Sequence, residues 1–192
     1  MARPRGFDEQ EVLACAMRMF WRGGYEATTT RAIEAGTGVG IRSLANTFGE
    51  KDELFVRALR MYREMAGGIL DQTFDPPDGN AIVAFFSGMG APTEDAEDVR
   101  NAGCLMVNTT FELTRTSPAI RAEVEGYRGM FRDRFAEALR ADGVADADAR
   151  AEYLVGSLWG ALSQIRLMGS TEAAKPMIDV VIATVEGWRQ RG

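Results

Sequence analysis

The sequence contains no histidine and only two cysteines among its 192 residues. Without histidine, a Ser–His or Cys–His nucleophile pair cannot form within the chain, and the imidazole ligands common in transition-metal sites are missing. Cys15 and Cys104 lie far apart and neither belongs to a CxxC pair, which argues against a disulfide framework and a thiolate metal cage. An enzyme would have to work with carboxylates, Lys, Tyr or Cys, and no catalytic constellation of these residues stands out. We expect no catalytic residues, no metal site and no cofactor.

Long apolar runs are also absent. No stretch approaches the roughly 18 residues needed to cross a bilayer, and the first ten residues, MARPRGFDEQ, lack the apolar core of a signal peptide. We expect a cytoplasmic protein with no membrane partner. Alternation with a period of two, bounded by hairpin turns, is missing as well. The sequence therefore predicts an all-α fold of about nine helices.

The negative charge is unevenly distributed along the chain. The net charge is −6, yet residues 1–60 carry nine basic and eight acidic side chains, so the remainder carries −7. Such an asymmetry indicates two parts with different tasks. A near-neutral first part can still bind nucleic acid, because affinity depends on local phosphate contacts and counterion release.

Three glycines are crowded into residues 34–44, EAGTGVGIRSL. A dinucleotide-binding loop needs the spacing GxGxxG directly after a buried strand, but here the third glycine comes one residue early and follows an amphipathic segment. A short helix, a glycine-rich turn and a second short helix instead fit a helix-turn-helix. In this interpretation Val39 and Leu44 face the first helix. A loop between two core helices explains the glycines equally well.

Helical periodicity and capping signals place the other segments. Asp8 is a predicted N-cap with Glu11 three residues on, Thr28 or Thr29 caps the next helix, and Ser117 with Pro118 opens a later one. We expect the remaining helices within residues 41–48, 50–70, 80–90, 104–115, 117–141, 149–169 and 175–188.

Residues 7–59 resemble the N-terminal domain of TetR-family transcriptional regulators. The matching features are an apolar first helix with MF before GGYEATT, then Ile33, Gly38-Val39, Leu44, Phe48, Lys51, Leu54 and Phe55. The resemblance implies a three-helix helix-turn-helix domain over residues 1–52 and a helical ligand-binding and dimerisation domain over residues 53–192.

The resemblance also implies a function. We expect a homodimeric repressor that binds double-stranded operator DNA and is released by a small-molecule inducer. The alternative is a helical small-molecule-binding protein or enzyme that keeps the helix-turn-helix without binding an operator. The expected DNA-binding residues are Thr28, Thr29, Arg31, Gly40, Ile41, Arg42, Ser43, Asn46, Thr47 and Lys51. Among them Arg42, Ser43 and Asn46 suit base edges, and Arg3 and Arg5 form an N-terminal arm.

Two residue sets are expected in the second domain. An apolar pocket with a few polar groups is the usual small-molecule site, and its predicted lining is Phe85, Phe86, Met89, Met106, Asn108, Phe111, Glu112, Tyr127, Phe131 and Trp159. Apolar stripes on the last two long helices predict a four-helix dimer interface made by Leu154, Leu158, Leu162, Ile165, Val181, Thr184 and Trp188.

Cys104 begins a predicted helix after an acidic loop. A thiol at a helix N-terminus can have a lowered pKa and become reactive, and GCLMVN resembles a TetR-family subgroup that includes regulators responding to oxidants or electrophiles. The hypothesis is that Cys104 is a sensor thiol. The competing interpretation is a buried cysteine that acts as a small hydrophobic residue.

Overall fold

The computed structural model describes residues 6–93, 95, 98–112 and 117–190. Within these ranges it contains nine α-helices, two short 3-10 helices and no strand, which confirms the predicted class. The elements are α1 (Glu9–Gly23), α2 (Thr30–Thr37), α3 (Ile41–Phe48), α4 (Lys51–Thr73), α5 (Gly79–Met89), η1 (Val99–Ala102), α6 (Leu105–Glu112), α7 (Pro118–Ala141), α8 (Ala147–Met168), η2 (Thr171–Ala174) and α9 (Lys175–Arg189).

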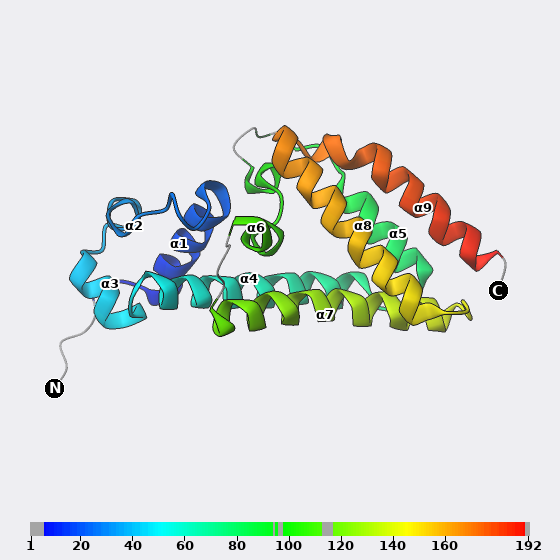
Figure 1. Ribbon diagram of the computed structural model, residues 1–192, viewed down its shortest axis with the longest axis horizontal. Coiled ribbons are helices and arrows are strands. Elements are labelled where there is room, and N and C mark those ends of the chain that lie inside the picture. Colours follow the sequence, from blue (N-terminus) through cyan, green and yellow to red (C-terminus); the bar gives the residue numbers. More distant parts are fainter. Residues whose placement is uncertain (1–5, 94, 96–97, 113–116, 191–192) are drawn as a thin grey trace.

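The molecule is elongated, and α1–α3 lie together at one end (Figure 1). We call α1–α3 the head and α5–α9 the body. Helix α4 runs from the head along the body and packs beside α7, while α6 lies where the head meets the body (Figure 1). The predicted domain boundary after residue 52 falls in the first turn of α4, so one continuous helix joins the two parts.

The predicted caps at the helix starts are present. Asp8 accepts hydrogen bonds from the backbone N–H groups of residues 10 and 11, Thr29 from that of residue 32, and Ser117 from that of residue 120. Each satisfies a donor that the first helical turn leaves unpaired. The run of threonines left Thr28 and Thr29 as alternatives, and the structure selects Thr29.

Aromatic side chains fill the interior at both ends of α4. In the head, the rings of Phe20 and Phe55 meet edge to face, with centroids 4.8 Å apart. Farther along the chain, Phe74, Phe86 and Phe135 pack together between α4, α5 and α7. These contacts bury the apolar stripes that periodicity predicted. None of the described helices is both long enough and apolar enough to cross a membrane.

Candidate DNA interface and internal cavity

A tight turn joins α2 to α3. Gly38 ends α2 in the left-handed conformation, with φ of 70°, which glycine adopts without strain. Gly40 has no side chain to cap α3, and the carboxylate of Glu34 supplies an acceptor for the N–H of Ile41 at 3.1 Å. Val39 and Leu44 are buried beneath the turn, as the helix-turn-helix interpretation predicts. The segment is therefore a compact helix-turn-helix.

The outward face of α3 carries polar side chains. Arg42, Ser43 and Asn46 are exposed, and Ile41 beside them is 38% exposed. Gly40, Ser43, Asn46 and Thr47 line a polar surface hollow together with residues from the α2–α3 turn. The structure thus brings together the predicted residues of this helix on one accessible surface, with the chemistry that suits base edges and phosphates.

The predicted phosphate contacts at α2 and α4 differ in their accessibility. Thr29 and Arg31 are exposed at the start of α2. Lys51 is partly buried, with its ammonium 4.1 Å from the ring centre of Tyr25, and the Tyr25 hydroxyl donates to Asp52. Burial, followed by that hydrogen bond, raises the pKa of Tyr25. The ring therefore stays neutral and fixes Lys51 at the first turn of α4.

Thr28 is a wrong prediction. Its side chain is 4% exposed, and its hydroxyl donates to the carbonyl oxygen of Gly24 at 2.6 Å. Because this hydroxyl is buried and hydrogen-bonded within the head, it is not available to a DNA phosphate. Arg3 and Arg5, the predicted N-terminal arm, lie outside the described residues.

A partly open cavity of about 400 Å³ lies between α1, α4 and the helices of the body. Four predicted pocket residues, Phe85, Met89, Tyr127 and Phe131, line it. Its other walls come from helices α1, α4, α5 and α8 and from the segments around η1 and η2: Trp21, Tyr62, Met65, Ala66, Ile69, Thr73, Ala84, Gly88, Arg100, Gly103, Leu158, Leu162, Ile165 and Thr171. The volume lies in the range of small-molecule sites.

Six predicted pocket residues do not line this cavity. Phe86 and Met106 are fully buried in packed core, and Trp159 packs against the far side of the cavity wall through Tyr127. The other three, Asn108, Phe111 and Glu112, line a separate surface pocket with Ser163, Arg166 and Leu167. Helical periodicity identifies a buried face without telling which buried side chains border unfilled space, so it could not separate these six residues from the cavity lining.

Trp21 is a cavity residue that the sequence analysis missed. It lies on α1, where its apolar neighbours predicted only head core, yet it borders the cavity in the body. Its indole N–H donates to the carbonyl oxygen of Gly103 at 2.9 Å. No local sequence signal relates residues 82 positions apart.

Cys104 lies in the interior. It is 0% exposed, and its thiol lies 3.3 Å from the Tyr127 hydroxyl oxygen as a hydrogen-bond donor. Burial raises the pKa of the Cys104 thiol. The predicted lowering at a helix N-terminus is wrong, because loss of solvent outweighs the backbone N–H groups of the first turn. This position does not suit a sensor thiol.

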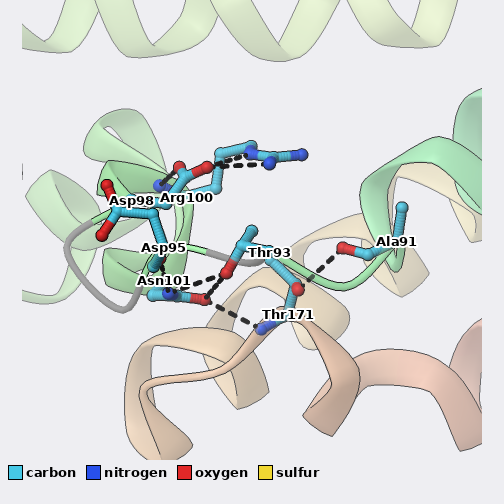
Figure 2. Close-up of polar contacts among 7 residues, drawn as sticks. All are labelled: Ala91, Thr93, Asp95, Asp98, Arg100, Asn101 and Thr171. Carbon is cyan, nitrogen blue, oxygen red and sulfur yellow. Dashed lines mark hydrogen bonds and ion pairs between the residues drawn. The ribbon is translucent and has the colours of Figure 1, made fainter.

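A polar network joins described residues between α5 and α6 to Thr171 of η2 (Figure 2). The Asn101 side chain bonds to the Thr93 hydroxyl and accepts from the backbone N–H of Thr171 at 3.3 Å. The Thr171 hydroxyl donates to the carbonyl oxygen of Ala91 at 2.8 Å. Nearby, Arg100 binds Asp98 through two nitrogens (Figure 2). These bonds connect Ala91, Thr93 and Asn101 with Thr171, and Arg100 and Thr171 line the cavity.

The apolar stripes predicted to form the dimer interface face the interior of the protomer. Leu154, Leu158, Leu162, Ile165 and Val181 are buried inside the protomer, so they cannot form a surface for a second copy. The stripes repeat correctly, but other parts of the chain cover them: α7 packs on α8, and α5 packs on α9. Thr184 and Trp188 remain partly accessible. The exposed apolar residues of α8 and α9 are Tyr153, Leu167, Met168 and Val180.

Two family models match the chain. The model of bacterial regulatory proteins of the tetR family matches residues 12–58, and the model of the tetracyclin repressor-like C-terminal domain matches residues 81–181. The first match covers the head with the beginning of α4, and the second covers most of the body.

Individual relatives agree with these matches. The chain is 28% identical over 184 residues to the HTH-type transcriptional repressor AcnR of Corynebacterium efficiens, covering 92% of this chain and 91% of that protein. It is 30% identical over 131 residues to the HTH-type transcriptional repressor ComR of Escherichia coli, covering 67% and 61%. A cysteine mutant of the regulator CifR, solved with 26 bp double-strand operator DNA, superposes with a TM-score of 0.79 at 26% identity, covering 97% and 100%.

Proposed function

The chain belongs to the TetR family of DNA-binding transcriptional regulators, and from that premise we propose that it is a homodimeric repressor that leaves its operator when a small molecule fills the internal cavity. The observation that carries DNA binding is the outward face of α3, where Arg42, Ser43 and Asn46 stand exposed beside a polar hollow. Arginine matches the acceptors of guanine, and asparagine those of adenine.

Further residues position the head on the duplex in this proposal. Thr29 and Arg31 at α2 and Lys51 at α4 approach phosphates from either side of α3, where helix N-termini favour anions. Such contacts fix register without reading sequence. CifR, whose structure holds operator DNA, supports this placement through its similar fold.

The dimer is proposed to form through the outward face of α8 and α9. Val180 is 60% exposed and Leu167 is 76% exposed, and the rings of Tyr153 in α8 and Trp188 in α9 meet edge to face. Exposed apolar side chains gathered on two neighbouring helices favour contact with another protein surface. A two-fold pair would present two heads to successive major grooves, about 34 Å apart.

The experiment measures fluorescence anisotropy of the purified protein against labelled DNA from upstream of its own gene. Arg42→Ala is expected to weaken specific binding by about 1–3 kcal/mol. Arg132→Ala, which removes the same charge from a partly exposed position in α7, serves as the matched control and is expected to leave affinity unchanged. Equal affinities for both variants would reject α3 as the reading helix.

The same measurement distinguishes the proposed repressor from the second candidate function, a helical small-molecule-binding protein that does not bind an operator. A helical binding protein that retains the head without using it would bind no duplex, specific or otherwise, whatever the residue at position 42. The exposed polar face of α3 favours the operator-binding function, because a head that is not used has no need of base-reading side chains there.

A further inference from the structure

Resting on the proposed function, we propose that the cavity takes an uncharged aromatic molecule and that Trp21 is the residue through which this ligand weakens DNA binding. The first part follows from the chemistry of the cavity walls. The second follows from the position of Trp21, which belongs to the head by its helix and to the cavity by its side chain.

The cavity walls favour aromatic rings. Five aromatic side chains line the space: Trp21, Tyr62, Phe85, Tyr127 and Phe131. Such rings prefer offset or edge-to-face contacts with another ring, which add to the gain from apolar burial. At about 400 Å³ the cavity has room for a small ring system with short substituents.

The same walls disfavour charge. Arg100 is the one charged side chain among the described lining residues, and its Nε and Nη2 both donate to Asp98, at 3.0 and 2.8 Å. Its charge is therefore already compensated. An ammonium or carboxylate entering the cavity would lose part of its hydration against apolar walls without gaining an unpaired partner, which is unfavourable.

The hydroxyl groups of Tyr62 and Tyr127 do not make the cavity more favourable for a charged ligand. Both interact with the Cys104 thiol and with each other, and burial raises the pKa of Tyr62 and of Tyr127. They stay protonated and turn their rings toward the cavity, so neither supplies a charge for a cationic ligand. Hydrophobic contact therefore dominates recognition.

Trp21 connects the cavity to the head. Its indole lies edge to face on Tyr62, with ring centroids 4.8 Å apart, and its Nε1 donates to the Gly103 carbonyl oxygen at 2.9 Å. Because the hydrogen bond is buried, breaking it without a replacement leaves both groups unsatisfied and is unfavourable. A ring that wedges against the indole therefore acts on α1 directly.

Gly103 is the fixed partner in this contact. It has φ of 75°, and a Cβ there would lie 2.8 Å from the carbonyl oxygen of Leu162 in α8. With its backbone packed this closely on α8, Gly103 cannot shift toward α8 to follow a displaced indole. The ligand therefore moves Trp21 and α1 relative to α8.

Other contacts at this end of α1 are polar and partly exposed. Glu112 accepts from the backbone N–H of Tyr25 at 3.0 Å, and Arg166 donates to the carbonyl oxygen of Arg22 at 3.0 Å. Exchange with water weakens such bonds. Release of Trp21 would consequently weaken the attachment of α1 to the body, while α1 stays packed on α4 through Phe20 and Phe55. Even a small reorientation matters, because two heads must keep their spacing to fit successive grooves.

The ligand class is tested with three probes that share one nitroaromatic ring: 4-nitrobenzyl alcohol, 4-nitrobenzoate and 4-nitrobenzylammonium. The protein is the Trp159→Phe/Trp188→Phe variant, in which Trp21 is the remaining tryptophan. The uncharged alcohol is expected to quench its fluorescence saturably and to bind about tenfold or more tighter than either ion. Tighter binding of an ion, or no saturable quenching by the alcohol, would overturn the assignment. No DNA is needed, so this result is independent of the proposed function.

The role of Trp21 is tested with Trp21→Phe, which keeps an aromatic wall but has no N–H donor. In the wild type, saturating 4-nitrobenzyl alcohol is expected to weaken operator binding within the roughly 5–150-fold range of allosteric coupling. Trp21→Phe should still bind the alcohol by calorimetry, bind the operator more weakly when unliganded, and show a change below about twofold on ligand addition. Trp159→Phe, which lies behind Tyr127 and does not line the cavity, is the control and should respond as the wild type does.

A second readout keeps the test decisive without DNA. Amide hydrogen exchange over residues 9–23 should rise when the alcohol binds the wild type and should already be high in Trp21→Phe. If Trp21→Phe does not fold, Trp21→Met gives a second apolar variant without a donor. A full wild-type response in a folded variant at position 21 would overturn the coupling. Failure of the wild type to bind any duplex would instead reject the proposed function.

Discussion

The carboxylate of Glu123 in α7 accepts two hydrogen bonds from the guanidinium of Arg60 in α4, each at 3.1 Å. Its other oxygen lies 3.3 Å from Arg63, one turn farther along α4. The Glu123 side chain is 8% exposed, whereas the two arginines are 54% and 34% exposed. This contact holds α4, the helix that leaves the head, against the body.

Removing that carboxylate should weaken the structure moderately. Glu123→Ala is expected to lower the free energy of unfolding by about 1–2 kcal/mol, less than for a fully buried pair because both arginines keep solvent. Urea denaturation followed by circular dichroism measures the change. Glu125→Ala, at an exposed position of the same helix, is the control, and an equal loss in both variants would show that the contact itself stabilises nothing.

Glycine in the middle of α4 should be replaceable with a gain in stability. A Cβ at Gly68 would have open space around it, since no other atom lies within 4 Å. Gly68→Ala is expected to raise the free energy of unfolding by about 0.5–1 kcal/mol, because alanine loses less backbone entropy in a helix. Thermal unfolding gives the result. Gly38→Ala is the opposite case, since φ of 70° there strains alanine, and the expectation fails if both variants shift in the same direction.

Stability should fall as the solution becomes alkaline. Burial raises the pKa of Cys104 above its ordinary value of 9.0. Above that pH the unfolded chain therefore releases a proton that the folded chain keeps. The unfolded state then binds fewer protons, and the free energy of unfolding falls by up to about 1.4 kcal/mol per pH unit for this group.

Denaturation at pH 8, 9 and 10 tests this linkage. Cys104→Ala should flatten the decline between pH 9 and 10, and Cys15→Ala, at the partly buried cysteine, should leave it unchanged. A decline of the same slope in all three proteins would assign it to other groups. Slow alkylation of Cys104 in the folded protein should accompany the result, because the reactive form is the thiolate.

If the proposed dimer is correct, a charged substitution on the outer face of α9 should weaken dimerisation. Val180→Glu places a charge where an apolar side chain is 60% exposed, and burying that charge against a second copy is unfavourable. The variant should sediment as a monomer at concentrations where the wild type is a dimer. Gln72→Glu, which adds the same charge on the exposed side of α4, should remain a dimer, and a dimeric Val180→Glu would move the interface elsewhere.

The sequence alone determined the class of the fold, the helix starts at Asp8, Thr29 and Ser117, and the sharp turn at Gly38. These features follow from interactions within a few residues: a side-chain oxygen for the unpaired N–H groups of a first turn, and a backbone conformation that glycine adopts most easily. The exposed face of α3 was predictable for the same reason, since Leu44 and Val39 fix which side is buried.

Only the tertiary structure decided how the buried faces are used. Periodicity marked Leu158 and Phe85 alike as apolar, but the packing of α4, α5, α7 and α8 made them both walls of one cavity. The same packing placed Trp21, a residue of the head, against Gly103 and the cavity. It also buried Cys104 away from solvent. Burial, empty volume and contacts between distant segments depend on how whole helices pack against one another, and no local pattern specifies that arrangement.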